Sequence, residues 1–150
     1  MSDEIFMKMA LEEARKAFSC DEVPVGAVVV HHGKVIASGY NQVESKKDAS
    51  FHAELIALKK AAKVLDGWRL QECTLYCTLE PCSMCAGAMF LFRIPRLVWA
   101  APDIRHGSNG SIVDLFSIPH PIHRIEVTKG VLGDESSQLL KEFFQAKRRK

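Results

Sequence analysis

The chain has 150 residues, 47% of them hydrophobic and 25% charged, with 20 Lys and Arg against 18 Asp and Glu. These values exclude a chain that is disordered overall, and the length suits one domain spanning residues 1–150. The longest uncharged apolar run, residues 84–92, is far shorter than the roughly 20 residues of a membrane span. The acidic N-terminus is unlike a secretory signal, so we expect a cytoplasmic protein without a membrane partner.

The first half of the chain predicts a helix, a hairpin, a loop and a second helix. Apolar residues recur at helical spacing over residues 5–18. Two β-rich runs, residues 23–30 and 35–40, flank a Gly-bearing turn that is typical of a hairpin. Residues 41–50 are polar and predict a loop, and residues 54–65 return to helical spacing.

The second half alternates strands and helices. We expect strand, helix, strand, loop, strand and helix over residues 74–79, 83–92, 96–101, 103–110, 125–128 and 135–147. This order indicates an α/β protein with a mixed sheet, antiparallel in its hairpin and continued by β-α-β crossovers. Helices are expected on both faces of that sheet.

Two short motifs stand at the starts of predicted helices, His-Ala-Glu at 52–54 and Pro-Cys-Ser-Met-Cys at 81–85. His52, Cys82 and Cys85 offer one nitrogen and two sulfurs, a donor set that suits Zn²⁺. The positive end of a helix favours thiolates in its first turn. Three protein ligands leave the fourth tetrahedral position open for water, as in catalytic rather than structural zinc sites.

Glu54 follows His52 by two residues, close to the metal without being needed as a ligand. A carboxylate there can take a proton from water activated by zinc and pass it to a substrate. A closed structural zinc site is the alternative, with Cys73 or Cys77 as the fourth ligand. Otherwise Cys20 and Cys73 are ordinary core or surface thiols.

The combination of His-x-Glu and Pro-Cys-x-x-Cys is the signature of zinc-dependent nucleobase deaminases. Residues 22–30, 39–41, 52–54 and 79–89 resemble the bacterial tRNA-specific adenosine deaminases, and the resemblance covers nearly the whole chain. It implies a three-layer α/β/α cytidine-deaminase-like fold with a five-stranded mixed sheet, one Zn²⁺ per subunit and a homodimer. It also implies a reaction, the hydrolytic deamination of adenosine to inosine at the wobble position of an arginine tRNA.

The resemblance implies a role for each matching residue. His52, Cys82 and Cys85 become the zinc ligands, and Glu54 shuttles protons while activated water attacks C6 of adenine. Substrate contacts fall to Asn41 (the flipped-out nucleotide), the backbone of Ala53 (the base), Asp103 (a neighbouring sugar), Arg105 (phosphate), Phe144 (an anticodon-loop base), and Lys147 and Arg148 (the RNA backbone). Aromatic stacking and phosphate contacts are the usual means of holding splayed-out RNA bases.

Each of the substrate contacts also has a plainer interpretation. Asn41 suits a turn, Asp103 and Arg105 suit a solvated loop, Phe144 suits the core face of a helix, and the basic end suits a solvated helix terminus. Glu80 is expected to be a turn or packing residue without a chemical role.

The chain departs from the family pattern in two places. Residues 50–51 are Ser-Phe where the family usually has Thr-Ala, which puts the pocket rim in question. Leu91 and Phe92 replace polar residues and form, with Met89 and Phe90, an apolar cluster that suits either the core or a dimer surface.

Two rival functions remain open at this stage. A deaminase of a free base or nucleoside, such as guanine or cytidine, would carry the same zinc motifs, because these build the reaction centre and not the substrate pocket. A zinc-stabilised RNA-binding module without catalysis is the alternative of another class. The basic end, Phe144 and the loop at 103–105 favour RNA.

Overall fold

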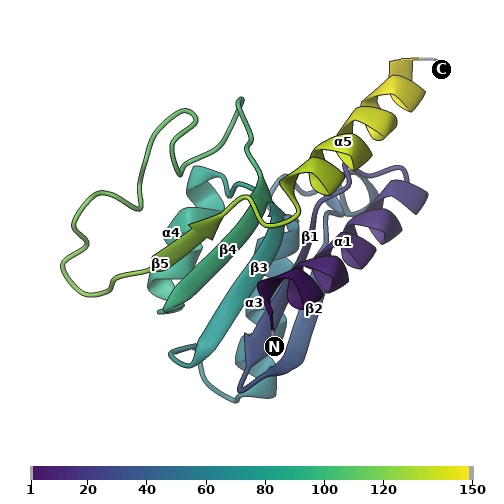
Figure 1. The fold of residues 1–150 in the computed structure, drawn as a ribbon. Helices are drawn as coiled ribbons and strands as arrows, with labels where there is room; N and C mark the ends of the chain where they lie inside the picture. Colours follow the sequence, from purple (N-terminus) through teal and green to yellow (C-terminus); the bar gives the residue numbers. More distant parts are fainter. Residues whose placement is uncertain (1, 149–150) are drawn as a thin grey trace.

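A computed structural model describes residues 2–148 and contains a five-stranded mixed sheet with helices against both faces (Figure 1). The elements in chain order are α1 (Asp3–Ser19), β1 (Gly26–His31), β2 (Lys34–Tyr40), α2 (Val43–Lys46), α3 (Ala53–Val64), β3 (Cys73–Leu79), α4 (Ser83–Leu91), β4 (Arg96–Ala101), β5 (Glu126–Lys129) and α5 (Gly133–Arg148). The strand order is β2-β1-β3-β4-β5, with β1 antiparallel to β2 and β3, and β4 parallel to β3 and β5. The expected three-layer α/β/α fold is confirmed.

The two faces of the sheet bury different side chains, as the alternation along β4 shows. Leu97 and Trp99 pack in the cluster formed with α3 and α4, whereas Val98 and Ala100 pack with Met7 of α1. Because both faces are covered, the central strands are continuous apolar runs and not alternating ones. Figure 1 shows α1 and α5 on one face and α3 and α4 on the other.

Two boundaries differ from the sequence prediction. β1 begins at Gly26, three residues later than expected, because Pro24 has no N–H to donate and Val25 turns back onto the carbonyl of Val23. The polar stretch predicted as a loop contains the short helix α2. Its N-terminal N–H groups donate to the carboxylate of Glu22, a contact across some twenty residues that local pattern does not reveal.

Gly39 brings the start of α3 close to the sheet. A Cβ at this position would lie 2.8 Å from the carbonyl oxygen of Ala53, so only glycine lets the helix start approach β2 so closely. The turn before α3 carries His52, and Gly39 therefore helps to place that side chain.

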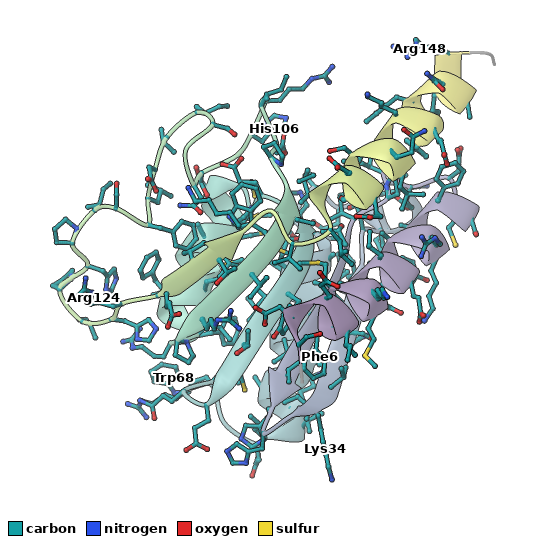
Figure 2. The ribbon with its side chains drawn as sticks, viewed as in Figure 1. Phe6, Lys34, Trp68, His106, Arg124 and Arg148 are labelled. Carbon is teal, nitrogen blue, oxygen red and sulfur yellow. The ribbon has the colours of Figure 1, made fainter. Side chains whose placement is uncertain are left out.

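The C-terminal ends of β2, β3 and β4 meet at one edge of the sheet, because these three strands run in the same direction. Asn41, Cys82 and Asp103 follow within three residues of those ends. Figure 2 shows His106 and Arg148 toward this end of the molecule and Lys34 and Trp68 at the opposite end. The carboxyl end of the strands is where open α/β sheets bind their ligands.

Across residues 2–148, none of the helices combines the length and the apolar character that crossing a membrane demands.

Candidate active site

Two helix starts bring His52, Cys82 and Cys85 together. His52 and Cys82 immediately precede α3 and α4, and Cys85 lies in the first turn of α4. Nδ1 of His52 is 3.6 Å from Sγ of Cys82 and 3.5 Å from Sγ of Cys85. Zinc bonds of about 2.0–2.3 Å at tetrahedral angles place the ligand atoms roughly 3.6 Å apart. The donor types and their spacing therefore fit Zn²⁺.

The electrostatics of this group favour a cation. Hydrogen bonds from the Cys85 thiol and from His52 lower the pKa of Cys82 to about 4, although burial opposes ionisation. The hydrogen bond to Cys82 raises the pKa of His52, and the same thiolate together with burial raises the pKa of Cys85. One thiolate is thus stabilised at the start of α4, where the helix end adds partial positive charge.

Neither of the other core cysteines joins this group. Cys77 is fully buried, and its Sγ contacts the carbonyl oxygen of Leu79 at 3.3 Å. Cys73 begins β3, at the far end of that strand from Cys82. Among the described residues, neither cysteine lies in the cluster of possible metal ligands around His52, so the structure does not support a closed four-ligand site.

Glu54 stands beside the metal-binding group in a cavity of about 660 Å³ that His52 and Cys82 also line. Its side chain is buried, with the residue 4% exposed, and burial raises the pKa of Glu54 to about 7. A carboxyl group with this pKa can both take up and release a proton near neutral pH. The cavity volume is in the range of small-molecule sites.

Asn41 lines the same cavity and is only 9% exposed. Its Nδ2 donates to the carbonyl oxygen of Val23 at 3.3 Å, whereas its Oδ1 has no hydrogen-bond partner within residues 2–148. A buried amide oxygen is costly unless something donates to it. A turn role alone does not account for this arrangement, and Asn41 is available as an acceptor for a bound molecule.

Ala53 and Asp103 also line the cavity, but Arg105 does not. Oδ1 of Asp103 accepts from the backbone N–H groups of Arg105 at 3.1 Å and His106 at 3.3 Å, which closes a turn at the cavity mouth. His106 contributes to the lining, while Arg105 is exposed. Of the two loop residues that the sequence indicated, Asp103 lines the cavity and Arg105 does not.

The predicted RNA contacts on α5 lie on the surface. Phe144 is 42% exposed and packs edge-on against the buried Phe143, so the interpretation of Phe144 as a core residue is wrong. Lys147 forms an ion pair with Asp21 at 2.9 Å, and Arg148 is exposed at the end of the described chain. The last two residues of the basic end, 149–150, lie outside the described residues.

Two buried carboxylates in the cavity lining were not predicted as site residues. Glu22 accepts from the backbone N–H groups at the start of α2, and Glu80 accepts from Ser111 and from backbone N–H groups of the loop after β4. Burial opposes ionisation of Glu80, but hydrogen bonds led by the one from Ser111 lower its pKa. The sequence signal is a charge next to an apolar run, before residues 23–30 for Glu22 and after residues 74–79 for Glu80.

The apolar cluster of residues 89–92 lies partly in the core and partly on the surface. Met89 and Phe90 are buried, and Phe92 packs against the core, whereas Leu91 is 68% exposed. Ser50 and Phe51 do not line the cavity, so this departure from the family pattern leaves the inner pocket unchanged.

Comparisons with known proteins agree with this geometry. The family of MafB19-like deaminases matches residues 1–148. The tRNA-specific adenosine deaminase of Bacillus subtilis is 43% identical, over 99% of this chain and 92% of its own length. The solved structure of a tRNA:A34 deaminase, studied for A-to-I editing at the wobble position, has a TM-score of 0.86 and 42% identity, over 90% of this chain and 98% of that one. A guanine deaminase from Nitrosomonas europaea has a TM-score of 0.80 and 30% identity, over 95% and 84%.

The matches extend over all the segments that line the cavity, from Glu22 to Val113. The chain therefore belongs to the MafB19-like deaminases and, within them, to the family of tRNA-specific adenosine deaminases.

Proposed function

We propose that the chain hydrolyses adenosine to inosine at the wobble position of a tRNA in the cytoplasm, with an arginine tRNA as the first candidate substrate. The observation that carries this proposal is the single cavity shared by His52, Cys82, the buried Glu54 and Asn41. In the reaction a C6–O bond forms, the C6–N bond breaks and ammonia leaves.

The metal site belongs to His52, Cys82 and Cys85, which would hold one Zn²⁺ per subunit. A zinc ion there supplies an activated water at neutral pH, since it lowers the pKa of bound water toward about 7. Glu54 takes up the proton that this water gives up. It delivers this proton to the ring nitrogen N1, then takes the second proton of the water from the new hydroxyl group on C6 and delivers it to the amino group, which leaves as ammonia.

The cavity walls hold the base. Oδ1 of Asn41 accepts a hydrogen bond from the flipped-out nucleotide, and the backbone of Ala53 contacts the base edge. Asp103 stands at the mouth beside a neighbouring sugar. Ile112 and Val113, from the loop after β4, supply apolar lining that keeps bulk water from the base.

Cationic and aromatic groups at the same end of the molecule would hold the RNA strand. Arg105 and Arg148 are exposed, and the ring of Phe144 is accessible for stacking on a base. Lys147 is paired with Asp21 in an exposed ion pair, which is weak enough for an RNA phosphate to replace the carboxylate.

A homodimer is supported by the outer face of α4. Met84, Gly87 and Leu91 are all exposed and recur at helical spacing, which makes one apolar stripe. A stripe of this kind next to a metal-binding turn suits a second copy of the chain, because obligate interfaces resemble protein cores.

Two observations count against the rival functions. A deaminase of free bases is disfavoured by the lower identity to the guanine deaminase, 30% against 43% for the tRNA-specific relative. A binding module without catalysis gives no reason for a buried carboxyl beside the metal ligands.

The test incubates the zinc-loaded protein with an arginine tRNA that carries wobble adenosine, and in parallel with free adenosine, cytidine and guanine. Inosine in the tRNA is the expected result. If ammonia forms only from a free base or nucleoside, the tRNA is not the substrate. If no ammonia forms from any of the four compounds, the chain is a zinc-stabilised RNA-binding module without catalysis.

A further inference from the structure

The carboxylate of Glu80 is the centre around which the loop of residues 103–111 is folded. Glu80 follows β3 directly and is 2% exposed. Its Oε1 accepts from the backbone N–H of Asp103 at 3.1 Å and from the hydroxyl of Ser111. Its Oε2 accepts from the backbone N–H of Asn109 at 2.8 Å and of Ser111 at 3.2 Å. Both ends of the loop are therefore bound to one side chain.

The middle of the loop passes directly over the same carboxylate. A Cβ at Gly107 would collide with the carboxyl group of Glu80, so glycine is needed where the loop passes over it. Gly107 also forms a β-bridge with Cys82, and Ser108 donates to the carbonyl oxygen of Pro81 through its N–H at 2.9 Å and its hydroxyl at 2.7 Å. The loop is thus attached to the turn that carries a metal ligand.

We propose that Glu80 is a positioning residue for the RNA substrate, because it holds the loop of residues 103–111 in the shape that forms one wall of the base cavity. Asp103 and His106 reach the lining from this loop, which has no helix or strand of its own to fix it. Hydrogen bonds from backbone N–H groups to an ionised carboxylate are roughly twice as strong as neutral ones. A loop held in its bound shape avoids the entropic cost of ordering when substrate arrives. The inference rests on the proposed function, since it places adenosine in this cavity.

Glu80→Gln tests the proposal, because the amide directs an NH₂ group against the N–H groups that now donate to oxygen. The KM for wobble-adenosine tRNA is expected to rise roughly tenfold or more, whereas kcat falls less than about threefold. The reason for this split is that the three metal ligands and Glu54 stand at the starts of α3 and α4 and not on the loop itself. Zinc content should remain that of the wild type.

Two further variants separate positioning from a general loss of stability. Ser136→Ala removes a buried hydrogen bond of 2.6 Å to the carbonyl oxygen of Thr78, away from the loop, and should lower Tm without changing KM. Ser111→Ala removes one hydroxyl donor and leaves the backbone bonds to Glu80, so it should raise KM less than Glu80→Gln. If Glu80→Gln does not fold, Ser111→Ala replaces it as the test variant, and a raised KM with an unchanged zinc content is the expected result.

A double-mutant cycle tests whether the loop and the carboxylate act through one contact. Gly107→Ala alone should raise KM, because the added Cβ displaces the loop from Glu80. Combined with Glu80→Ala, it should raise KM no further than the larger single effect, since the obstructing carboxylate is gone. A KM in the double variant raised by the product of the two single fold-changes would contradict the proposal, because the two substitutions would then act independently.

The outcomes are distinguishable. A wild-type protein that forms no inosine in tRNA would overturn the proposed function. An active wild type with an unchanged KM in Glu80→Gln would overturn the role of Glu80 alone. Loss of zinc or of kcat at constant KM would also overturn it, because Glu80 would then serve the metal centre.

Discussion

Carboxyl groups in this protein differ in protonation because their surroundings differ. Burial raises the pKa of Glu54 to about 7, while hydrogen bonds from Arg96 hold the pKa of Asp3 at about 2. Both residues lie in the first turn of a helix, where the positive helix end favours the anion. A guanidinium pairs with Asp3, whereas burial has the largest effect at Glu54. Asp3 is therefore held as an anion, and Glu54 can exchange a proton near neutral pH.

Glu54→Ala is expected to lower inosine formation by at least about a thousandfold, because Glu54 is the proposed proton carrier at C6. The other buried carboxylates of the cavity, Glu22 and Glu80, accept from backbone N–H groups. Zinc should remain bound at one ion per chain, since Glu54 is not one of the three donors. Turnover is measured on tRNA and zinc by atomic absorption. Glu12→Ala, an exposed glutamate of α1, is the matched control and should leave both unchanged. Near-normal turnover in Glu54→Ala would show that Glu54 is not the proton carrier.

At the scale of helices and strands, the sequence predicts the elements whose signals lie within a few neighbouring residues. The His-Ala-Glu and Pro-Cys-x-x-Cys segments are helix starts, and helix starts have local signals, so the metal-binding group could be predicted. Helix α2 and the shape of the loop after β4 depend on Glu22 and Glu80, which act across twenty or more residues. A pattern of neighbouring residues contains no record of such contacts. The residue pattern placed Phe144 in the core for the same reason, because its exposure depends on how α5 is packed.

The ion pair between α1 and β4 should make stability depend on pH. Arg96 donates to both oxygens of Asp3, at 2.8 and 2.7 Å, and the hydroxyl of Tyr76 donates to one of them at 2.7 Å. Because the folded state lowers the pKa of Asp3, this stabilisation is present above about pH 4 and is lost as pH falls toward 2.

Asp3→Asn should therefore lower the unfolding free energy at pH 7 by about 1–2 kcal/mol, a value reduced for partial exposure of the pair. The difference from wild type should shrink as the pH falls from 5 to 3, as urea unfolding would show. Glu4→Gln changes another acid in the same helix turn, one that is exposed. An equal loss in both variants would assign the effect to the helix end instead of the ion pair.

Removal of residues 147–150 from the end of α5 should raise KM for tRNA more than it lowers kcat. Basic side chains at this end would neutralise RNA phosphates, and each such contact steepens the salt dependence of binding. Measured between about 50 and 200 mM salt, the truncated protein should show a shallower slope than the full chain. A KM and a slope equal to those of the full chain would make this end a solvated helix terminus.

At the scale of the whole molecule, the proposed homodimer can be tested on the apolar stripe of α4. Leu91→Glu places a charge at the C-terminal end of that stripe and is expected to shift the protein from dimer to monomer in sedimentation velocity. Val64→Glu introduces the same charge at an exposed position at the end of α3 and should leave the dimer intact. A wild-type protein that sediments as a monomer at micromolar concentration would contradict the dimer.

The ends of three strands, two helix starts and one loop together build the cavity in which adenosine would react. The most direct measurement is the sequencing of an arginine tRNA with wobble adenosine after incubation with the zinc-loaded protein, with Glu54→Ala in parallel. The account predicts inosine at the wobble position alone, formed by the wild type and not by the variant. Adenosine unchanged at that position, or inosine formed equally by both proteins, would contradict it.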